Sequence, residues 1–179
     1  MRKLAAKPMK VLRAAHIAGA SLWTGSLACI AMALVGPMGA SAEGAHALID
    51  LLLRIDTWLI IPAVAVVACG AVIYGVASNW GFAKHRWVLS KWVLFLAAVI
   101  PASILFVPTC ESMQLVLLEL GESALGSSAF QEGRVLLLGL SIYLLALSAL
   151  MVLISTVKPW GKCRAKKRSE PAIKPVRAE

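Results

Sequence analysis

The sequence predicts an all-α membrane protein, a bundle of four transmembrane helices with both termini in the cytoplasm. The first observation is composition: 60% of the 179 residues are hydrophobic and 15% are charged, with a mean hydropathy of +0.81. A soluble domain of this length has too little interior to bury so much apolar surface, whereas lipid solvates it. The second observation is four long apolar runs, and the third is that the basic residues gather on one side of them.

The four predicted helices cover residues 14–35, 57–78, 88–107 and 135–157. Each is close to the roughly 20 residues that a helix needs to cross a ~30 Å hydrocarbon core. Transmembrane strands would be about ten residues long and would alternate in polarity, and these runs do not alternate. We therefore expect one integral membrane domain over residues 1–179, ending in a basic cytoplasmic tail at 158–179.

The first run has a second interpretation, because it also carries the parts of a cleavable signal peptide. A basic start is followed by the apolar run, by Gly36-Pro37 and then by the small residues Ala40-Ser41-Ala42. The run covers 22 residues, whereas a signal core has roughly 7–15. We expect it to be retained as the first transmembrane helix. Cleavage after Ala42 is the alternative, and it would leave three helices in the same orientation.

The distribution of charge predicts the orientation. The first tail, the second loop with the entry to the third helix, and the last tail hold five, three and eight of the 18 Lys and Arg residues. Cytoplasmic segments carry such an excess, so both termini are expected inside and the acidic first and third loops outside. The basic tails suit anionic lipid headgroups. No nucleic-acid partner is expected, because the basic residues flank the apolar runs.

The stretch WGFAKHRWVLSKW, between the second and third helices, is typical of a membrane border. Trp80, Trp87 and Trp92 fall at the predicted cytoplasmic interface, where an indole ring finds both apolar and polar surroundings. Lys91 is one turn into the third helix, and its stem can extend back to the headgroups. We predict that these four side chains anchor the helix ends.

The outer segments are predicted to add helix. HALIDLLLRID, residues 46–56, is amphipathic, and Asp50 and Arg54 are spaced for an ion pair. It either lies on the outer surface or extends the second helix outward. Residues 112–120 are apolar enough to prolong the third helix or to rest on the membrane. Arg54 and Asp56 are candidate functional residues at the outer interface, where an ion pair or a helix N-terminal carboxylate is the favoured role.

Three prolines fall in or beside the predicted helices. Pro62 and Pro101 lie inside helices and are expected to kink them, since proline removes one backbone hydrogen bond. Membrane helices tolerate this where neighbouring groups compensate. Pro108 is expected to end the third helix.

Motifs that carry chemistry are scarce. The chain has no C-x-x-C pair, no glycine-rich phosphate loop, no H-E-x-x-H and no nucleophile elbow. The four cysteines fall in four different segments, and we expect no metal site and no enzymatic activity. They are Cys29, Cys69, Cys110 and Cys163.

Two histidines allow a haem hypothesis. His16 and His85 fall at similar depth near the cytoplasmic ends of different helices, and such a pair could bind the iron of haem b axially. The favoured interpretation is simpler: His16 forms a hydrogen bond within the bundle, and His85 is an interfacial cation. On that interpretation no cofactor is expected.

Three pieces of the chain carry a family resemblance: AAHIAGASLWTGSL, RIDTWLIIPA and WGFAKHRWVLSKW. They resemble a family of small, uncharacterised bacterial integral membrane proteins with four helices, over roughly the first hundred residues. The first piece is also distantly similar to the opening helix of copper-resistance D-type membrane domains. The resemblance implies a bacterial inner-membrane location and no established enzyme function, and it assigns no catalytic residue.

These observations together predict a multi-pass inner-membrane protein that acts as a non-enzymatic structural, accessory or small-transport component. Its expected partner is the lipid bilayer, and a homo- or hetero-oligomer stays open. The alternative is a b-type haem-binding redox protein that uses His16 and His85.

Overall fold

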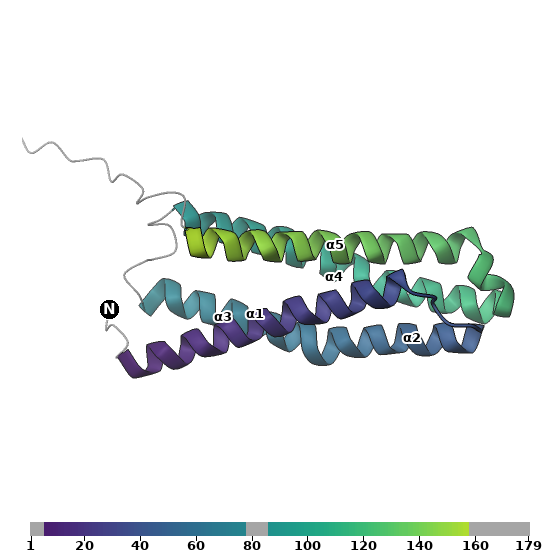
Figure 1. The fold of residues 1–179 in the computed structure, drawn as a ribbon, viewed down its shortest axis with the longest axis horizontal. Coiled ribbons are helices and arrows are strands. Elements are labelled where there is room, and N and C mark those ends of the chain that lie inside the picture. The colour runs from purple at the N-terminus through teal and green to yellow at the C-terminus, as the bar shows by residue number, and fades with distance from the viewer. Residues whose placement is uncertain (1–5, 78–85, 158–179) are drawn as a thin grey trace, which may run out of the picture.

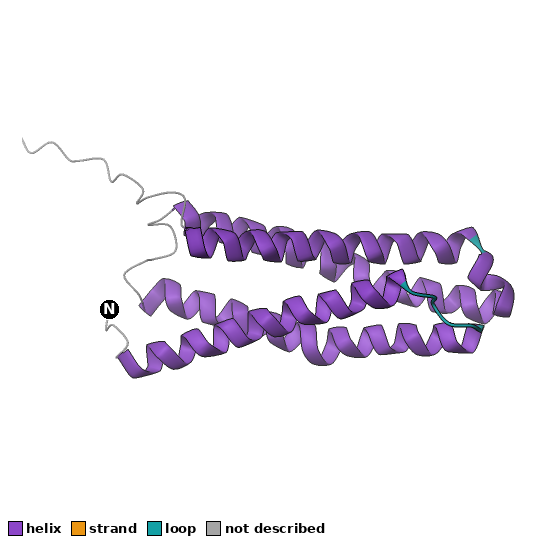
Figure 2. Cartoon of the chain, in the orientation of Figure 1, coloured by secondary structure: helices purple, strands orange, loops and turns teal. Residues whose placement is uncertain are grey.

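The structure, a computed structural model, describes residues 6–77 and 86–157. The prediction of an all-helical chain with four long apolar helices is confirmed: four helices are long and apolar enough to cross a membrane, and the described elements are helices joined by short connections (Figure 2). The helical elements are α1 (Ala6–Val35), α2 (Ala42–Ile55), the π-helical turn η1 (Asp56–Ile60), α3 (Ile61–Ala77), α4 (Arg86–Leu120), the 3₁₀ turn η2 (Gly121–Gly126) and α5 (Ser128–Val157).

These elements form four rods that lie side by side (Figure 1). One rod runs from α2 through η1 into α3, and another from α4 into η2. The start of α1, the end of α3, the start of α4 and the end of α5 lie together at one end of the bundle, named here the inner end. The α1–α2 connection and η2 lie toward the opposite, outer end. Both ends of the described chain are therefore on the same side.

The rods pack in the order α3, α1, α5, α4. α1 packs on α3 and α5, and α4 packs on α5 and, toward the outer end, on α2. Within the described residues, α3 makes no close backbone contact with α4 or α5. The inner half of the bundle is thus an open arc of backbones, whereas the outer half is closed by contacts of α2 with α4 and η2.

The core follows helical spacing along α1 and α5. On α1, Trp23, Leu27, Ile30 and Leu34 are buried at intervals of three and four residues, the spacing of one helix face. Cleavage after Ala42 would remove all four from the core. The same spacing on α5 produces a longer buried line, formed by Phe130, Gly133, Leu137, Leu140, Leu144 and Ser148.

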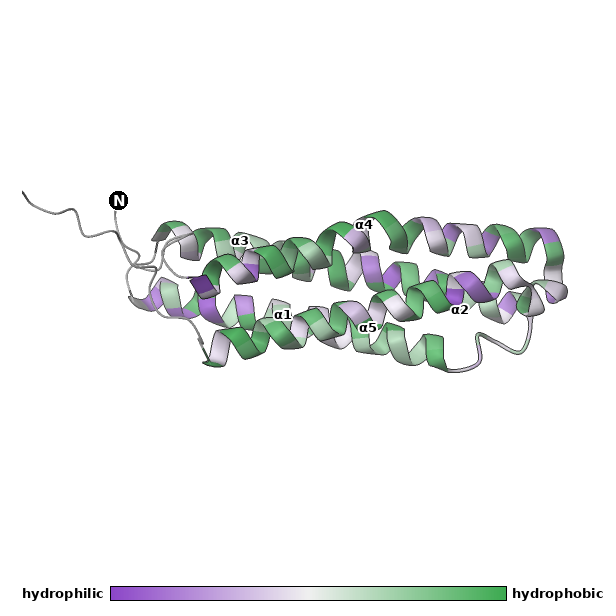
Figure 3. Ribbon diagram, turned by 90° about the horizontal axis from the view of Figure 1, so that it is seen from above, coloured by the Kyte–Doolittle hydropathy of each residue, from purple (hydrophilic) through white to green (hydrophobic). Residues whose placement is uncertain are grey.

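The helices continue past the predicted spans at the outer end. α4 has 35 residues, about 50 Å at 1.5 Å per residue, which exceeds a ~30 Å hydrocarbon core. Residues 46–56 extend the second helix outward, and residues 112–120 prolong the third. The Ser41 hydroxyl starts α2 by accepting a hydrogen bond from the Gly44 amide (3.1 Å). Hydrophilic residues gather along α2 and the outer part of α4 (Figure 3).

Pro108 does not end α4, contrary to the prediction, because α4 contains both Pro101 and Pro108. A proline in a helix leaves the carbonyl four residues earlier without its donor. For Pro101 that carbonyl belongs to Ala97, and it accepts a hydrogen bond from the Tyr143 hydroxyl of α5 (3.1 Å). A neighbouring helix thus supplies the missing donor, as membrane helices require.

Pro62 follows a wider helical turn. The Ile61 amide donates to the Asp56 carbonyl, five residues earlier, so the chain completes a π turn immediately before the residue that has no amide hydrogen. Single π turns of this kind occur inside α-helices. The consequence is that α2 and α3 join without a break in the helix.

Two glycines of α5 provide a matched test of this packing. A Cβ on Gly133 would lie 2.6 Å from Cγ of Met113, and Met113 is only 1% exposed. Gly133→Ala is therefore expected to lower the free energy of unfolding by about 1–3 kcal/mol through overpacking. Gly139 has no atom within 4 Å of the added carbon, so Gly139→Ala should be neutral or raise stability by up to about 1 kcal/mol. Reversible unfolding in mixed detergent micelles measures both, and equal stabilities would contradict the packing.

Candidate functional site

Arg134 of α5 holds the end of α1. Its Nε donates to the Leu34 carbonyl (2.9 Å), and its Nη2 donates to the carbonyls of Val35 (3.2 Å) and Gly36 (2.8 Å). The last four carbonyls of a helix have no donor within the helix. A cation there also complements the negative end of the helix dipole. One side chain thus closes α1 and joins it to α5.

Two further contacts bind α2 to the rod formed by α4 and η2. Both carboxylate oxygens of Glu122 accept from the amide of Ala42, each at 3.1 Å, which places a negative charge at the positive end of α2. Farther along, Nε2 of Gln114 donates to Oδ1 of Asp50 (2.7 Å). Arg134, Glu122, Gln114 and Asp50 are named here the outer polar network.

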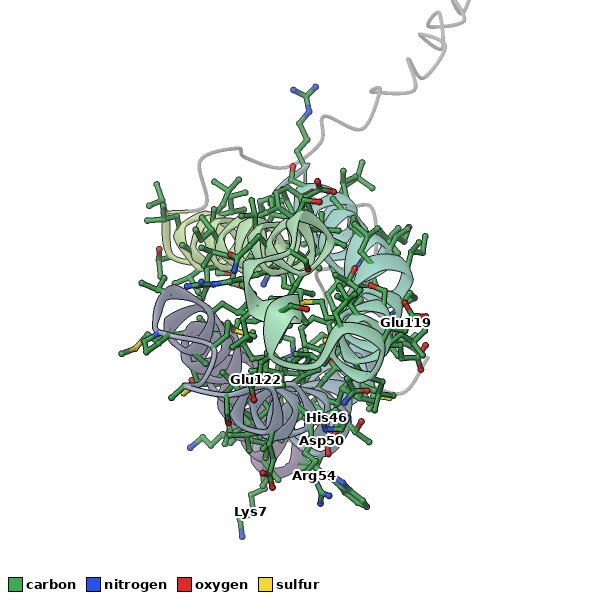
Figure 4. The ribbon with its side chains drawn as sticks, turned by 90° about the vertical axis from the view of Figure 1, so that its right-hand side faces the viewer. Lys7, His46, Asp50, Arg54, Glu119 and Glu122 are labelled. Atoms are coloured by element: carbon green, nitrogen blue, oxygen red, sulfur yellow. The ribbon has the colours of Figure 1, made fainter. Side chains whose placement is uncertain are left out.

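The surface of α2 beside this network carries the predicted outer charges. Arg54 is exposed, while Asp56, in the π turn, is half-buried. His46, Asp50 and Arg54 project from one side of α2 when the bundle is viewed from its outer end (Figure 4). A shallow hollow of about 250 Å³ lies here, and it is named the outer hollow; it is lined by Asp50, Leu53, Arg54, Thr57 and Trp58.

The outer hollow has the chemistry of a contact surface. The indole of Trp58 is 74% exposed, and it adjoins a guanidinium and a carboxylate. Trp and Arg are the side chains that most often dominate protein interfaces, since both combine a large contact area with hydrogen-bond donors. Helical π turns are also frequent at functional sites. This arrangement can bind a partner group by stacking and by hydrogen bonds.

At the inner end, His16 of α1 packs against α3. Its ring meets the Tyr74 ring edge-on, with centroids 5.9 Å apart. A Cβ on Gly70 would lie 3.0 Å from its Nδ1, so the absent side chain lets the imidazole lie against the α3 backbone. Among the described residues, Nδ1 of His16 is buried without a hydrogen bond of ordinary geometry.

Aromatic rings link α1 to α4, whose backbones do not touch. Trp23 meets Phe95 edge-on at 6.1 Å, and Phe95 meets Trp92 at 6.2 Å. Lys91 of α4 is half-buried.

The structure describes three of the four predicted anchor residues. Trp87, Lys91 and Trp92 lie in the first two turns of α4, and each is half-buried. Trp92 contacts the bundle through Phe95. Their anchoring role stays a prediction. Trp80 lies outside the described residues.

The haem pair is described only in part. His16 is placed as above, but His85 lies outside the described residues. Over residues 6–77 and 86–157, no three His, Cys, Asp or Glu side chains are grouped to hold a metal ion. Cys29, Cys69 and Cys110 are free thiols, and Cys163 is not among the described residues.

Sequence reasoning missed the contacts of the outer polar network. Arg134 reaches carbonyls 98 to 100 positions earlier, and Glu122 reaches an amide 80 positions earlier. No local sequence motif predicts contacts between residues so far apart in the chain. One signal was available: Arg134 is the lone basic residue of an otherwise acidic third loop. No family model, curated protein or solved structure matches the chain.

Removing the guanidinium of Arg134 tests its structural role. Arg134→Leu leaves three carbonyls without this donor, and we expect it to lower the free energy of unfolding by about 2–3 kcal/mol. Arg54→Leu is the matched control, because Arg54 is exposed, and it should change stability by less than about 0.5 kcal/mol. Thermal unfolding in detergent measures both. Equal losses would show that Arg134 does not hold α1.

Proposed function

We propose that this chain is a multi-pass protein of the bacterial inner membrane, with both termini cytoplasmic, and that it is a non-enzymatic structural or accessory component. Its role is to present the outer surface of α2 to another membrane or extracytoplasmic component. The observation that carries the proposal is the outer polar network, because its charged groups hold helices together. These contacts hold the helices of the outer end together in one defined surface.

The exposed side chains of that surface support a binding role. The outer hollow holds Trp58 and Arg54, and on α4 beyond Pro108 the side chains of Leu115 and Leu118 are also exposed, the latter by 73%. Covering such exposed apolar and aromatic side chains with a partner removes their apolar surface from water, which favours binding. A small-transport role is a variant of this proposal. Solute uptake by liposomes that contain the purified protein would favour it.

The orientation rests on charge. The end of the bundle where α1 and α4 start and α5 ends is also where the basic segments of the sequence attach, and positive segments stay in the cytoplasm. The resemblance to small bacterial four-helix membrane proteins agrees with an inner-membrane location.

Reporter fusions test the topology. A reporter placed after Glu179 should be active only in its cytoplasmic form, and one inserted within residues 121–128 only in its extracytoplasmic form. The physical reason is that positive flanks resist translocation. Two reporters on the same side would remove the four-span topology.

Photocrosslinking tests the accessory role. A photoreactive residue at Trp58 should give a discrete protein adduct in intact cells, and Arg54→Glu should abolish that adduct at unchanged membrane abundance, since the charge in the outer hollow is reversed. Val66, an exposed residue of α3, is the control position and should give lipid adducts only. Absence of a protein adduct at Trp58 and at Leu118 would overturn the proposal.

A b-type haem protein is the second candidate, and one observation favours it. The His16 imidazole is half-buried near the inner end, and its Nδ1 makes no hydrogen bond of ordinary geometry with the described residues. An axial pair would need a second histidine, for which the sequence offers His85. The visible spectrum of the purified protein decides: a stoichiometric Soret band that His16→Ala removes would replace the accessory role with a redox one.

A further inference from the structure

An apolar groove runs along the inner end of the bundle between α4 and α5. Its volume is about 640 Å³, within the ~300–1,000 Å³ typical of small-ligand sites. It spans the first turns of α4 and the last turns of α5, and aliphatic side chains dominate its walls. They include Leu89, Val93 and Leu94 of α4 and Leu150, Leu153 and Val157 of α5.

A positive charge stands beside one end of this groove. Arg86 is the first residue of α4, one turn before the lining begins, and it is exposed. The Ser90 hydroxyl, which also lines the groove, donates to the Arg86 carbonyl (3.1 Å) and so faces back toward that first turn. Arg86 and Ser90 are four residues apart and therefore share one face of α4, so the apolar groove has a basic residue one turn beyond its end.

Arg86 lacks a carboxylate partner within the described chain. Within the described ranges 6–77 and 86–157, the Asp and Glu side chains lie in α2, in η1, in the outer part of α4, in η2 and in the first turns of α5. None of these segments lies at the inner end (Figure 1). An anionic partner of Arg86 would therefore come from outside the described residues.

We propose that the groove binds an anionic phospholipid, with one acyl chain between α4 and α5 and the phosphate group on Arg86. A guanidinium matches a phosphate in geometry and charge and can donate two parallel hydrogen bonds to it. The exposed wall residues Leu89, Leu153 and Val157 face hydrocarbon in a membrane-spanning bundle, where an acyl chain fits between them. Basic pockets between transmembrane helices on the cytoplasmic side bind such headgroups. The proposal rests on membrane insertion and not on the accessory role.

Native mass spectrometry of the purified full chain in detergent tests the site. Dioleoylphosphatidylglycerol and dioleoylphosphatidylcholine have the same acyl chains and differ in net charge. We expect one saturable phosphatidylglycerol adduct, about tenfold weaker in Arg86→Gln, as the loss of one charge-assisted contact predicts. Leu153→Trp, which fills the groove, should weaken both lipids. Inorganic phosphate should give no adduct, because it lacks the chain.

Two controls separate the groove from general lipid affinity. Arg13→Gln removes an exposed charge of α1, and Val72→Trp adds bulk at an exposed position of α3; both should bind phosphatidylglycerol like the parent chain. Circular dichroism confirms that each variant is folded. Equal binding of the two lipids, or an adduct unchanged by Leu153→Trp, would overturn the proposal. A dimer that Leu153→Trp dissociates would identify the groove as a contact between two copies instead.

Discussion

The end of α1 needs hydrogen-bond donors, and Arg134 provides them. α1 stops short of the outer end while the other three rods continue (Figure 1), so its terminal carbonyls lie beside the rods that extend past them. Unsatisfied backbone groups at such a place cost several kcal/mol near lipid. The guanidinium supplies three hydrogen bonds. Because α1 can end there, the chain can turn into α2. The outer half of the bundle is then completed by three rods: α2, α4 with η2, and α5.

The outer half of the bundle combines a buried apolar core, with Ile49, Met113 and Phe130, and polar contacts between rods. In the outer half, charges from one rod meet helix ends of another, as Glu122 does at Ala42. In the inner half, contacts between rods are apolar and aromatic, such as Trp23 with Phe95. The polar contacts of the outer half fit the proposed surface for a partner, and the apolar side chains of the inner half fit the proposed lipid site.

Much of the fold could be predicted from the sequence, because hydropathy and length act locally. The four apolar runs became helices, and the amphipathic pattern of residues 46–56 became α2. The prediction that Pro108 ends the third helix was wrong, since a proline removes one backbone hydrogen bond and can lie inside a helix without ending it. The partners of Arg134, Glu122 and Asp50 could not be predicted, because they depend on which rods lie side by side. The Asp50–Arg54 spacing suggested a local pair, yet the hydrogen bond recorded for Asp50 comes from Gln114.

Backbone hydrogen exchange of the chain in lipid nanodiscs tests the central claim most directly, because exchange separates folded helix from loop outside the hydrocarbon core. The account predicts slow exchange for the amides of α2 beyond its first turn and for the outer turns of α4, residues 112–120. In Arg134→Leu, exchange in α2 should rise while exchange in the middle of α3 stays unchanged. Exchange of both outer segments at the rate of an unstructured peptide in the parent chain would contradict the account, because the outer half would then be loops and not a closed helical surface.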